Sequence, residues 1–309
     1  MRLYPRYNVG MNFADHLLSK VSKSSPVVLG IDPNFSLMPS CLLPTSTSAG
    51  SVEDALVLFS KTVIDACQGL VPAVKLQSAY FEQFGTSGVR ALATVLRYAN
   101  EQGLVTILDV KRGDIGSTSL AYALGYLQGY TQVGTHKYVS DLESDCVTIN
   151  PFLGEDSVVP FVETAKANNK GLFILVKTSN PGSSLVMDVD CDGAPISHTL
   201  GRMLDDLGRD TIGDCGYSSM GAVVGATAVE ELNALRRVMP NTLFLMPGIG
   251  AQGGSVDLVK QAAQEDGLGA IVPISRGITY PKTKTTTVDA YQDAVRDAAV
   301  GFVQLIKEA

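Results

Sequence analysis

Charged side chains crowd into the stretch Leu108–Thr118, LDVKRGDIGST, at the end of an apolar run. Alternate residues of a β-strand share one face, so Asp109 and Lys111 would point the same way, with Asp114 three residues later. The spacing therefore predicts charges of opposite sign side by side on one face at the end of a buried strand.

Two further charges would meet this cluster if the apolar runs are parallel strands. Lys75 lies at the end of the run that begins at Leu70, and Asp32 follows the run that begins at Val27. Parallel strands of an α/β fold end at one face, where active sites form. We therefore expect these side chains to converge with Asp109 and Lys111. The alternative is a salt-bridge network that only braces the top of the sheet.

A glycine-rich loop, PGIGAQGG at residues 247–254, suggests a phosphate site. Its Gly248, Gly250 and Gly253 formally spell G-x-G-x-x-G. A dinucleotide-binding fold would need this motif near the start of a βαβ unit, with an acidic residue about twenty positions on. Here it follows the seventh of eight apolar runs, and Arg276 follows the eighth. Backbone N–H groups and a guanidinium at that place favour phosphate binding after strands seven and eight.

Eight short, β-rich apolar runs recur along the chain, and helical patterns fill the gaps. The runs cover residues 27–31, 70–76, 103–110, 146–150, 171–178, 221–227, 242–250 and 269–275. They do not alternate with polar residues, which is typical of parallel strands buried on both faces. Eight strands alternating with helices predict an α/β fold, a (β/α)₈ TIM barrel. A doubly wound open sheet is the alternative, because periodicity alone does not show closure.

Two stretches interrupt this rhythm. Asn34–Gly50 is rich in Pro, Ser and Thr and follows the first strand, and Asn180–Ser197 is a long loop after the fifth. Neither resembles a linker between independently folding units, so we expect one domain, residues 1–309, with insertions in these two loops. In a barrel both would lie at the carboxyl ends of the strands, where active sites form.

Composition narrows the classes of function. The net charge of −7 disfavours a nucleic-acid partner, and the 45% hydrophobic content suits a packed globular core. We expect no membrane association, because no stretch approaches the roughly 20 apolar residues of a membrane span. Five cysteines without a CxxC pair predict reduced thiols in a cytoplasmic protein. The histidines His16, His136 and His198 have no metal-ligand spacing, so no metal site is expected.

The stretch LDVKRGDIGST resembles the signature of the orotidine 5′-phosphate decarboxylase family, whose core is Asp-x-Lys-x-x-Asp. The Arg-Gly pair within it is similar to the second subtype of that family. Further matches occur in the family's order: GID at Asp32, VKLQ at Lys75, KTSNPGS at Lys177, PGIGAQGG at Pro247 and SRGITY at Ser275. Because these motifs span nearly the whole chain, their order is much more specific than any one of them.

The resemblance implies a role for each matching residue. Lys75, Asp109, Lys111 and Asp114 would form a catalytic charge network, in which Lys111 protonates C6 of the pyrimidine. Asp114, Ile115 and Thr118 would reach into the site of a partner subunit, so the enzyme would be a homodimer with shared sites. The residues implied to bind substrate are Asp32 and Gln77 (ribose, with a phosphate role also open for Gln77), Ser179 (pyrimidine edge), Asn180 and Pro181 (a flap), and Gln252, Gly253, Arg276 and Gly277 (phosphate). No cofactor and no metal would be needed.

The implied reaction is loss of carbon dioxide from orotidine 5′-phosphate, which leaves a carbanion that fixed charges would stabilise. Three other functions remain open from the sequence. A metal-dependent sugar-phosphate enzyme of the same suprafamily would carry an acidic ligand where Lys75 stands, and would be sensitive to a chelator. A Schiff-base aldolase would be trapped by borohydride. A non-catalytic nucleotide-binding barrel would bind uridylate without releasing carbon dioxide.

Overall fold

Eight parallel strands close into a barrel in the computed structural model, which describes residues 10–225, 229–248 and 257–308. Around the barrel the order is β1 (Val27–Ile31), β2 (Ala73–Gln77), β3 (Val105–Arg112), β6 (Cys146–Ile149), β7 (Gly171–Lys177), β10 (Ser218–Val224), β11 (Thr242–Leu245) and β12 (Ala270–Ile274). Each overlaps one of the eight predicted runs, although β10 begins three residues before its predicted run. Because β1 pairs with both β2 and β12, the sheet has no edges. The predicted barrel is confirmed and the open sheet is excluded.

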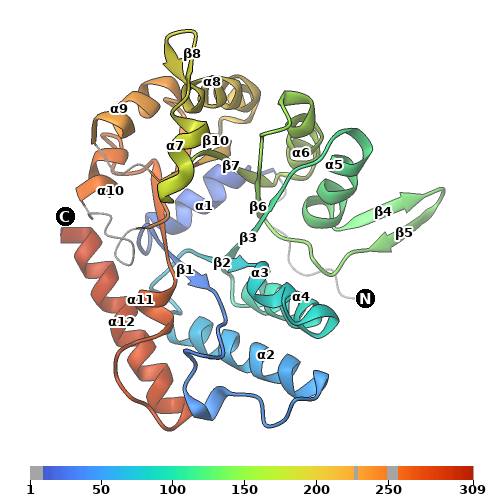
Figure 1. Cartoon of the computed structure of the whole chain (residues 1–309), viewed down its shortest axis with the longest axis vertical. Helices are drawn as coiled ribbons and strands as arrows, with labels where there is room; N and C mark the ends of the chain where they lie inside the picture. The colour runs from blue at the N-terminus through green and yellow to red at the C-terminus, as the bar shows by residue number, and fades with distance from the viewer. Residues whose placement is uncertain (1–9, 226–228, 249–256, 309) are drawn as a thin grey trace.

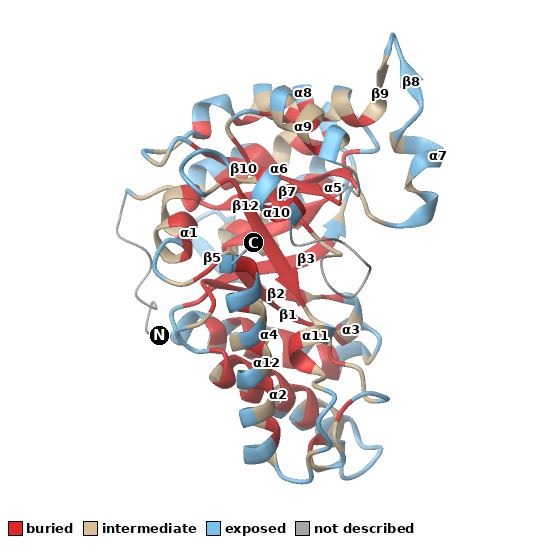
Figure 2. Cartoon of the chain, turned by 90° about the vertical axis from the view of Figure 1, so that its left-hand side faces the viewer, coloured by how far each residue is buried: buried red, intermediate tan, exposed pale blue. Residues whose placement is uncertain are grey.

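Helices surround this barrel, with buried residues on their inner faces and exposed residues on their outer faces, as Figures 1 and 2 show. They are α1 (Phe13–Val21), α2 (Ala49–Ala66), α3 (Ala79–Glu82), α4 (Gly85–Glu101), α5 (Gly116–Ala123), α6 (Glu155–Asn168), α7 (Ser184–Met187), α8 (Ile196–Gly208), α9 (Val229–Val238), α10 (Asp257–Ala262), α11 (Arg276–Thr279) and α12 (Val288–Glu308). Helix α2 begins where the Ser48 side chain accepts a hydrogen bond from the backbone of Ser51, an N-cap that satisfies a free N–H group.

The strands divide their side chains between two apolar cores because successive residues point to opposite faces. Val74, Leu76 and Leu108 point outward and pack beneath the helices. Ala73 and Val105 point into the barrel, together with side chains from the other strands and from α1, which covers the amino ends of the strands. At the carboxyl ends of β2, β3 and β6 the inward positions are polar instead, with Lys75, Gln77, Asp109 and Thr148. This change from apolar to polar along one face is what places chemistry at that end of the barrel.

The two long stretches follow β1 and β7, as expected, and each contains local structure. Residues 34–48 include a short 3₁₀ helix at Ser40–Leu42, and α2 begins at Ala49. The stretch after β7 holds a 3₁₀ turn at Pro181–Ser183, then α7, then the two-stranded hairpin β8 (Asp190–Cys191) and β9 (Ala194–Pro195). It ends where α8 begins at Ile196, so the last two residues of the predicted loop are helical.

A second hairpin, β4 (Tyr130–Val133) and β5 (His136–Val139), was not predicted from the sequence. It lies between α5 and β6 and projects from the body of the protein (Figure 1). Gly134 and Thr135 form its two-residue turn, and Gly134 has a positive φ of 58°. Within the described ranges, no helix combines the length and hydropathy that crossing a membrane requires.

Candidate active site

A cavity of about 330 Å³ opens at the carboxyl ends of the barrel strands. Its size lies in the range of about 300–1,000 Å³ that is usual for small-molecule sites. The predicted site residues that line it are Asp32, Gln77, Lys75, Asp109, Lys111, Ser179, Asn180, Arg276 and Gly277. Five strand ends and the loops after them thus deliver side chains that lie far apart in the sequence to one small volume.

Asp109 is the centre of the charged cluster at this cavity. Its Oδ2 atom lies 2.8 Å from Lys75 Nζ and 3.1 Å from Gln77 Nε2, and both groups donate to it. Its Oδ1 atom accepts from Lys111 Nζ at 2.6 Å and from the Thr148 hydroxyl at 2.7 Å. Among the described residues, no three His, Cys, Asp or Glu side chains form a group that could hold a metal ion. The positive charges at Asp109 come from the two lysines.

This cluster fixes the charge of its buried members. Burial alone would raise the pKa of Asp109, but the charges of Lys75 and Lys111 and their hydrogen bonds outweigh it and hold the pKa well below its usual range. Burial alone would lower the pKa of Lys75, but the charges of Asp109 and Asp32 raise it above its usual value. Both side chains are therefore ionised at neutral pH. Lys111 differs from them because its side chain is 44% exposed and can meet a ligand.

A distortion of β3 sets the direction of Lys111. The pairing between β3 and β6 shifts register between Leu108 and Arg112, and Lys111 itself has a positive φ of 44°. Few residues with a side chain adopt this conformation, and such outliers cluster at functional sites. The bulge lets Asp109 stay inside the barrel while Lys111 turns back to the same carboxylate. Strand periodicity predicted the shared face, but it did not predict the bulge.

Thr148 is a site residue that the sequence did not reveal. It lies on β6, is 1% exposed and lines the cavity. Its hydroxyl oxygen accepts from the backbone N–H of Lys111 at 2.9 Å, in addition to the bond to Asp109. A threonine in a buried strand is ordinary in sequence. Its inward position, two residues after Cys146 on the same face, was the available signal.

Close backbone contacts shape the rim of the cavity. A Cβ atom at Gly225 would lie 2.6 Å from the backbone nitrogen of Ser179, so glycine lets the loop after β7 approach β10. A Cβ atom at Gly277 would lie 2.6 Å from the ring of Phe302 on α12.

Arg276 is exposed at the same rim, and Asp32 has a buried Oδ1 atom with no hydrogen-bond donor among the described residues. These groups are available to a ligand.

Lys177 anchors the stretch that follows β7. It is 6% exposed and forms ion pairs with Asp188, just after α7, and with Glu231 Oε1 on α9 at 2.9 Å. Burial alone would lower the pKa of Lys177, but its hydrogen bonds to the two carboxylates raise it. Lys177 therefore links Asp188 and α9 to the end of β7, two residues before Ser179 in the cavity lining.

Several predicted residues lie outside the cavity lining. Asp114, Ile115 and Thr118 are at the start of α5, where the Asp114 side chain accepts from the backbone N–H of Ile115 at 2.8 Å. Ile115 is 56% exposed, and Pro181 also faces solvent. The predicted phosphate-binding residues Gln252 and Gly253, and Gly250 of the glycine motif, lie outside the described residues. Within one chain, the structure thus brings three of the four predicted catalytic residues together.

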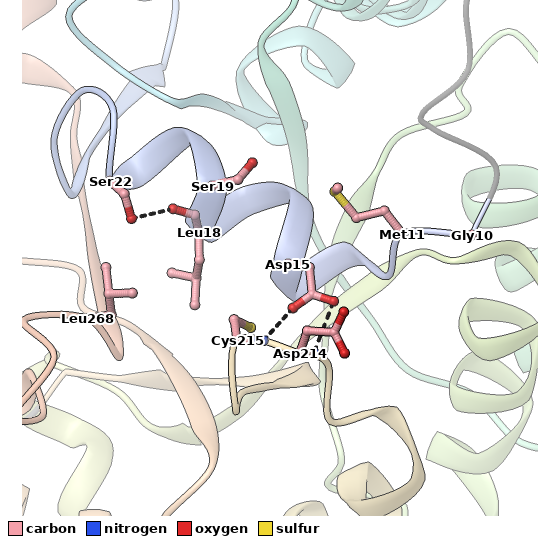
Figure 3. A pocket seen from close by; sticks show the side chains of 9 residues that line it. All are labelled: Gly10, Met11, Asp15, Leu18, Ser19, Ser22, Asp214, Cys215 and Leu268. Carbon is pink, nitrogen blue, oxygen red and sulfur yellow. Dashed lines mark hydrogen bonds between the residues drawn. The ribbon is translucent and has the colours of Figure 1, made fainter.

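A larger hollow, about 530 Å³, lies at the other end of the barrel (Figure 3). It is lined by α1 and by the loops that precede β10 and β12. Figure 3 shows Asp15 turned toward the loop backbone, where its carboxylate accepts from Cys215 N at 2.8 Å and Asp214 N at 3.2 Å. That carboxylate fastens α1 to the barrel, and none of the predicted site residues described by the structure lines this hollow.

Comparisons with known proteins agree with the geometry at the carboxyl face. The family model of orotidine 5′-phosphate decarboxylase / HUMPS proteins matches residues 44–291. The chain is 40% identical over 305 residues to the orotidine 5′-phosphate decarboxylase of Rhodopirellula baltica, across 96% of this chain and 99% of that protein. It is 38% identical to the Clostridium novyi protein of that name, across 85% and 87%. The structure of Leishmania donovani OMP decarboxylase superposes with a TM-score of 0.74 at 27% identity, covering 96% of this chain and 98% of that one. The resemblance of the sequence motifs is thereby confirmed, and the chain belongs to the orotidine 5′-phosphate decarboxylase / HUMPS family.

Proposed function

We propose that this protein decarboxylates orotidine 5′-phosphate to uridine 5′-phosphate without a cofactor. The observation that carries the proposal is the Lys75–Asp109–Lys111 cluster, with N–O distances of 2.8 and 2.6 Å, facing a nucleotide-sized cavity. Relatives that share most of the chain bear the name of this activity. The lysine at position 75 also disfavours the metal-dependent sugar-phosphate reaction, because an ammonium group stands where those enzymes place an acidic metal ligand.

The cluster suits a reaction that develops negative charge on carbon. When carbon dioxide leaves C6, the electron pair of the broken bond stays on C6. The Lys111 ammonium would stabilise that pair and then transfer one proton to C6, and water would later reprotonate the amine. Asp109 would lie near the substrate carboxylate, while Lys75 and Gln77 hold it in place. A fixed arrangement of charges needs no reorganisation during the reaction, which is the source of its catalytic effect.

The remaining lining residues would orient the nucleotide. The unpaired Oδ1 of Asp32 would accept from a ribose hydroxyl, with Gln77 beside it, and Ser179 would bind the edge of the pyrimidine. Arg276 and the backbone of Gly277 would bind the phosphate. We include Gln252 and Gly253 in that phosphate site, and Asn180 and Pro181 in a flap over the substrate. One barrel domain spanning residues 1–309 would carry the whole site.

We further propose a homodimer in which Asp114, Ile115 and Thr118 complete the partner's cavity. Their position outside their own cavity supports this arrangement. So do the exposed apolar side chains of the same segment, Ile115 at 56% and Leu120 at 43% exposure. Apolar residues grouped on a surface commonly mark a contact with another protein.

The test is the release of carbon dioxide from orotidine 5′-phosphate by purified protein in excess chelator. Turnover that chelator does not change supports the proposal. Turnover abolished by chelator and restored by a divalent metal would favour the metal-dependent reaction. Tight binding of uridine 5′-phosphate without carbon dioxide release would show a nucleotide-binding protein and overturn the catalytic assignment.

A further inference from the structure

Thr148 joins the two residues at the centre of the site. Its hydroxyl has one hydrogen, and a backbone N–H group can only donate. The bond from Lys111 N, at 2.9 Å, therefore uses the hydroxyl as acceptor, and the bond to Asp109 Oδ1, at 2.7 Å, uses it as donor. The reverse directions are impossible, because the backbone N–H group cannot accept a hydrogen bond and the ionised carboxylate cannot donate one. One buried hydroxyl thus fixes the backbone of Lys111 relative to the carboxylate of Asp109.

We propose that Thr148 is a positioning residue for proton transfer, a role that rests on the proposed decarboxylase function. Lys111 adopts a left-handed backbone at the β3 bulge, which residues with side chains rarely do. The hydrogen bond from its N–H to Thr148 favours that backbone conformation over ordinary strand geometry. With the backbone in that conformation, the side chain of Lys111 reaches the cavity with its Nζ atom.

The same hydroxyl acts on Asp109 during the reaction. In the described structure Oδ1 receives two donors, Lys111 Nζ and Thr148 Oγ1, while Oδ2 is held by Lys75 and Gln77. When Lys111 gives its proton to C6 it becomes a neutral amine, so Oδ1 loses its charged donor. Thr148 keeps donating to Oδ1 at that moment. It therefore holds the carboxylate in place and ionised while Lys111 moves toward carbon.

The experiment compares Thr148→Val, which removes the hydroxyl at nearly constant volume, with Thr148→Ser, which keeps it. We expect Thr148→Val to lower kcat by about 10- to 100-fold, the loss typical of a hydrogen bond to a charged group. Thr148→Ser should recover kcat to within about threefold of the wild type, since its hydroxyl can make both bonds but rotates more freely. The affinity for uridine 5′-phosphate should hardly change, because that ligand needs no proton transfer.

Controls separate positioning from folding. Thr62→Val removes another buried threonine hydroxyl, which bonds only to Leu58 O within α2, and should leave kcat unchanged. For every variant, kcat is expressed per binding site counted by titration with uridine 5′-phosphate, so misfolded protein does not lower it. Thr148→Ala is measured in parallel, since it removes the hydroxyl without placing an isopropyl group beside the N–H of Lys111.

Three outcomes would overturn the role. Wild-type kcat in Thr148→Val and Thr148→Ala would show that the hydroxyl does not matter for the reaction. Equal losses in Thr148→Val and Thr148→Ser, or loss of every binding site in the Val and Ala variants, would show a packing role. These results leave the proposed function intact if the wild type is active. Wild-type protein that releases no carbon dioxide refutes the proposed function, and the role of Thr148 with it.

Discussion

At the scale of single residues, Asp109 organises the site because it is a carboxylate with four donors. Two of the donors are ammonium groups, at 2.8 and 2.6 Å, and two are neutral. A buried carboxylate without such partners would take up a proton. Here the ion pairs keep it charged, and in return it fixes where Lys75 and Lys111 can lie. The two lysines differ in exposure, and this difference supports the proposed roles, in which the buried one holds the network and the half-exposed one reaches the substrate.

Lys111→Ala should lower kcat at least about 1,000-fold, because it removes both the proton donor and the charge that stabilises the carbanion. The protein should still fold, since the side chain is 44% exposed. Carbon dioxide release and the thermal midpoint would be measured together. Lys137→Ala, on the exposed hairpin β4–β5, serves as the matched control and should be as active as the wild type. A folded Lys111→Ala protein with near-normal turnover would remove this lysine from the mechanism.

The lowered pKa of Asp109 predicts how stability depends on pH. A carboxyl whose pKa is lower in the folded state stabilises the fold above its unfolded pKa, near about 4, and this contribution is lost as the pH falls below that value. The free energy of unfolding of the wild type should therefore fall between about pH 4 and pH 2. Asp109→Asn should be less stable at pH 7, because Lys75 is left buried without its carboxylate.

The change in stability between pH 7 and low pH should be smaller in Asp109→Asn than in the wild type, since this carboxyl no longer titrates. Urea unfolding at several pH values would measure the slope. Asp206→Asn, at an exposed ion pair with Arg209, is the control and should keep the wild-type slope. Identical slopes in the wild type and Asp109→Asn would contradict the lowered pKa.

At the scale of elements, each strand of the barrel delivers its last inward residue to one face, and the loops beyond complete the cavity. The loop after β12 supplies Arg276, and the stretch after β7 supplies Ser179 and Asn180. The stretch after β7 is held by Lys177, which forms ion pairs with Asp188 and Glu231. A substrate that contacts both loops can therefore couple its phosphate, which does not react, to the position of the stretch after β7.

Arg276→Ala should lower kcat/KM for orotidine 5′-phosphate about 30- to 1,000-fold, which corresponds to about 2–4 kcal/mol for a charge-assisted contact in a desolvated site. Binding energy from a remote group accelerates the reaction when it drives closure that the transition state needs. The slow decarboxylation of the phosphate-free nucleoside should hardly change.

Arg202→Ala, in which an exposed arginine on α8 is removed, is the control and should leave both substrates unaffected. An equal loss on orotidine 5′-phosphate and on the nucleoside would mean that Arg276 supports the fold or the charged cluster. The phosphate would then bind elsewhere.

The eight strands could be predicted because burial on both faces leaves an unmistakable apolar run. Period-two alternation predicted that Asp109 and Lys111 lie together, but their contact in the structure depends on the bulge at Lys111. Closure could not be predicted, because it depends on the pairing of β1 with β12 and not on any local pattern. The bulge at Lys111 and the bonds of Thr148 were missed since they arise between strands. The hairpin β4–β5 had a local signal, a Gly-Thr turn between β-branched and aromatic residues, which the search for apolar runs passed over.

At the scale of the whole molecule, the cavity is lined by three of the four residues of the predicted catalytic network, and the fourth, Asp114, lies outside its lining. In a homodimer, the segment at the start of α5 in each subunit would supply Asp114 to the cavity of the other subunit. The barrel suits such an exchange because β3 carries Asp109 and Lys111 at its end, and the segment that follows leads to the exposed Ile115.

Mixing Lys111→Ala with Asp114→Ala, each inactive alone, should restore about a quarter of wild-type activity after subunit exchange. Half of the dimers would then be mixed, and one of the two sites in each would be intact. Carbon dioxide release measures the recovery, and native mass spectrometry of differently tagged subunits verifies the exchange.

Lys111→Ala mixed with Asp109→Ala is the control for this experiment. Both residues belong to β3 of one chain, so every site would lack one of them and no activity should return. Verified exchange without recovery in the Lys111/Asp114 mixture would place Asp114 in the site of its own chain.

Closure of the barrel through β1 and β12 has a consequence for biosynthesis. Val27 pairs with Val272, so a strand made at the start of translation finds one of its neighbours only when almost the whole chain has left the ribosome. Such non-local pairing slows folding, because a long loop must close before the contact forms. Until then β1 and β11 each present an open edge, which can pair with another nascent chain. We therefore expect a chain truncated before Ala270 to keep open edges at β1 and β11 and to aggregate more readily than the full chain.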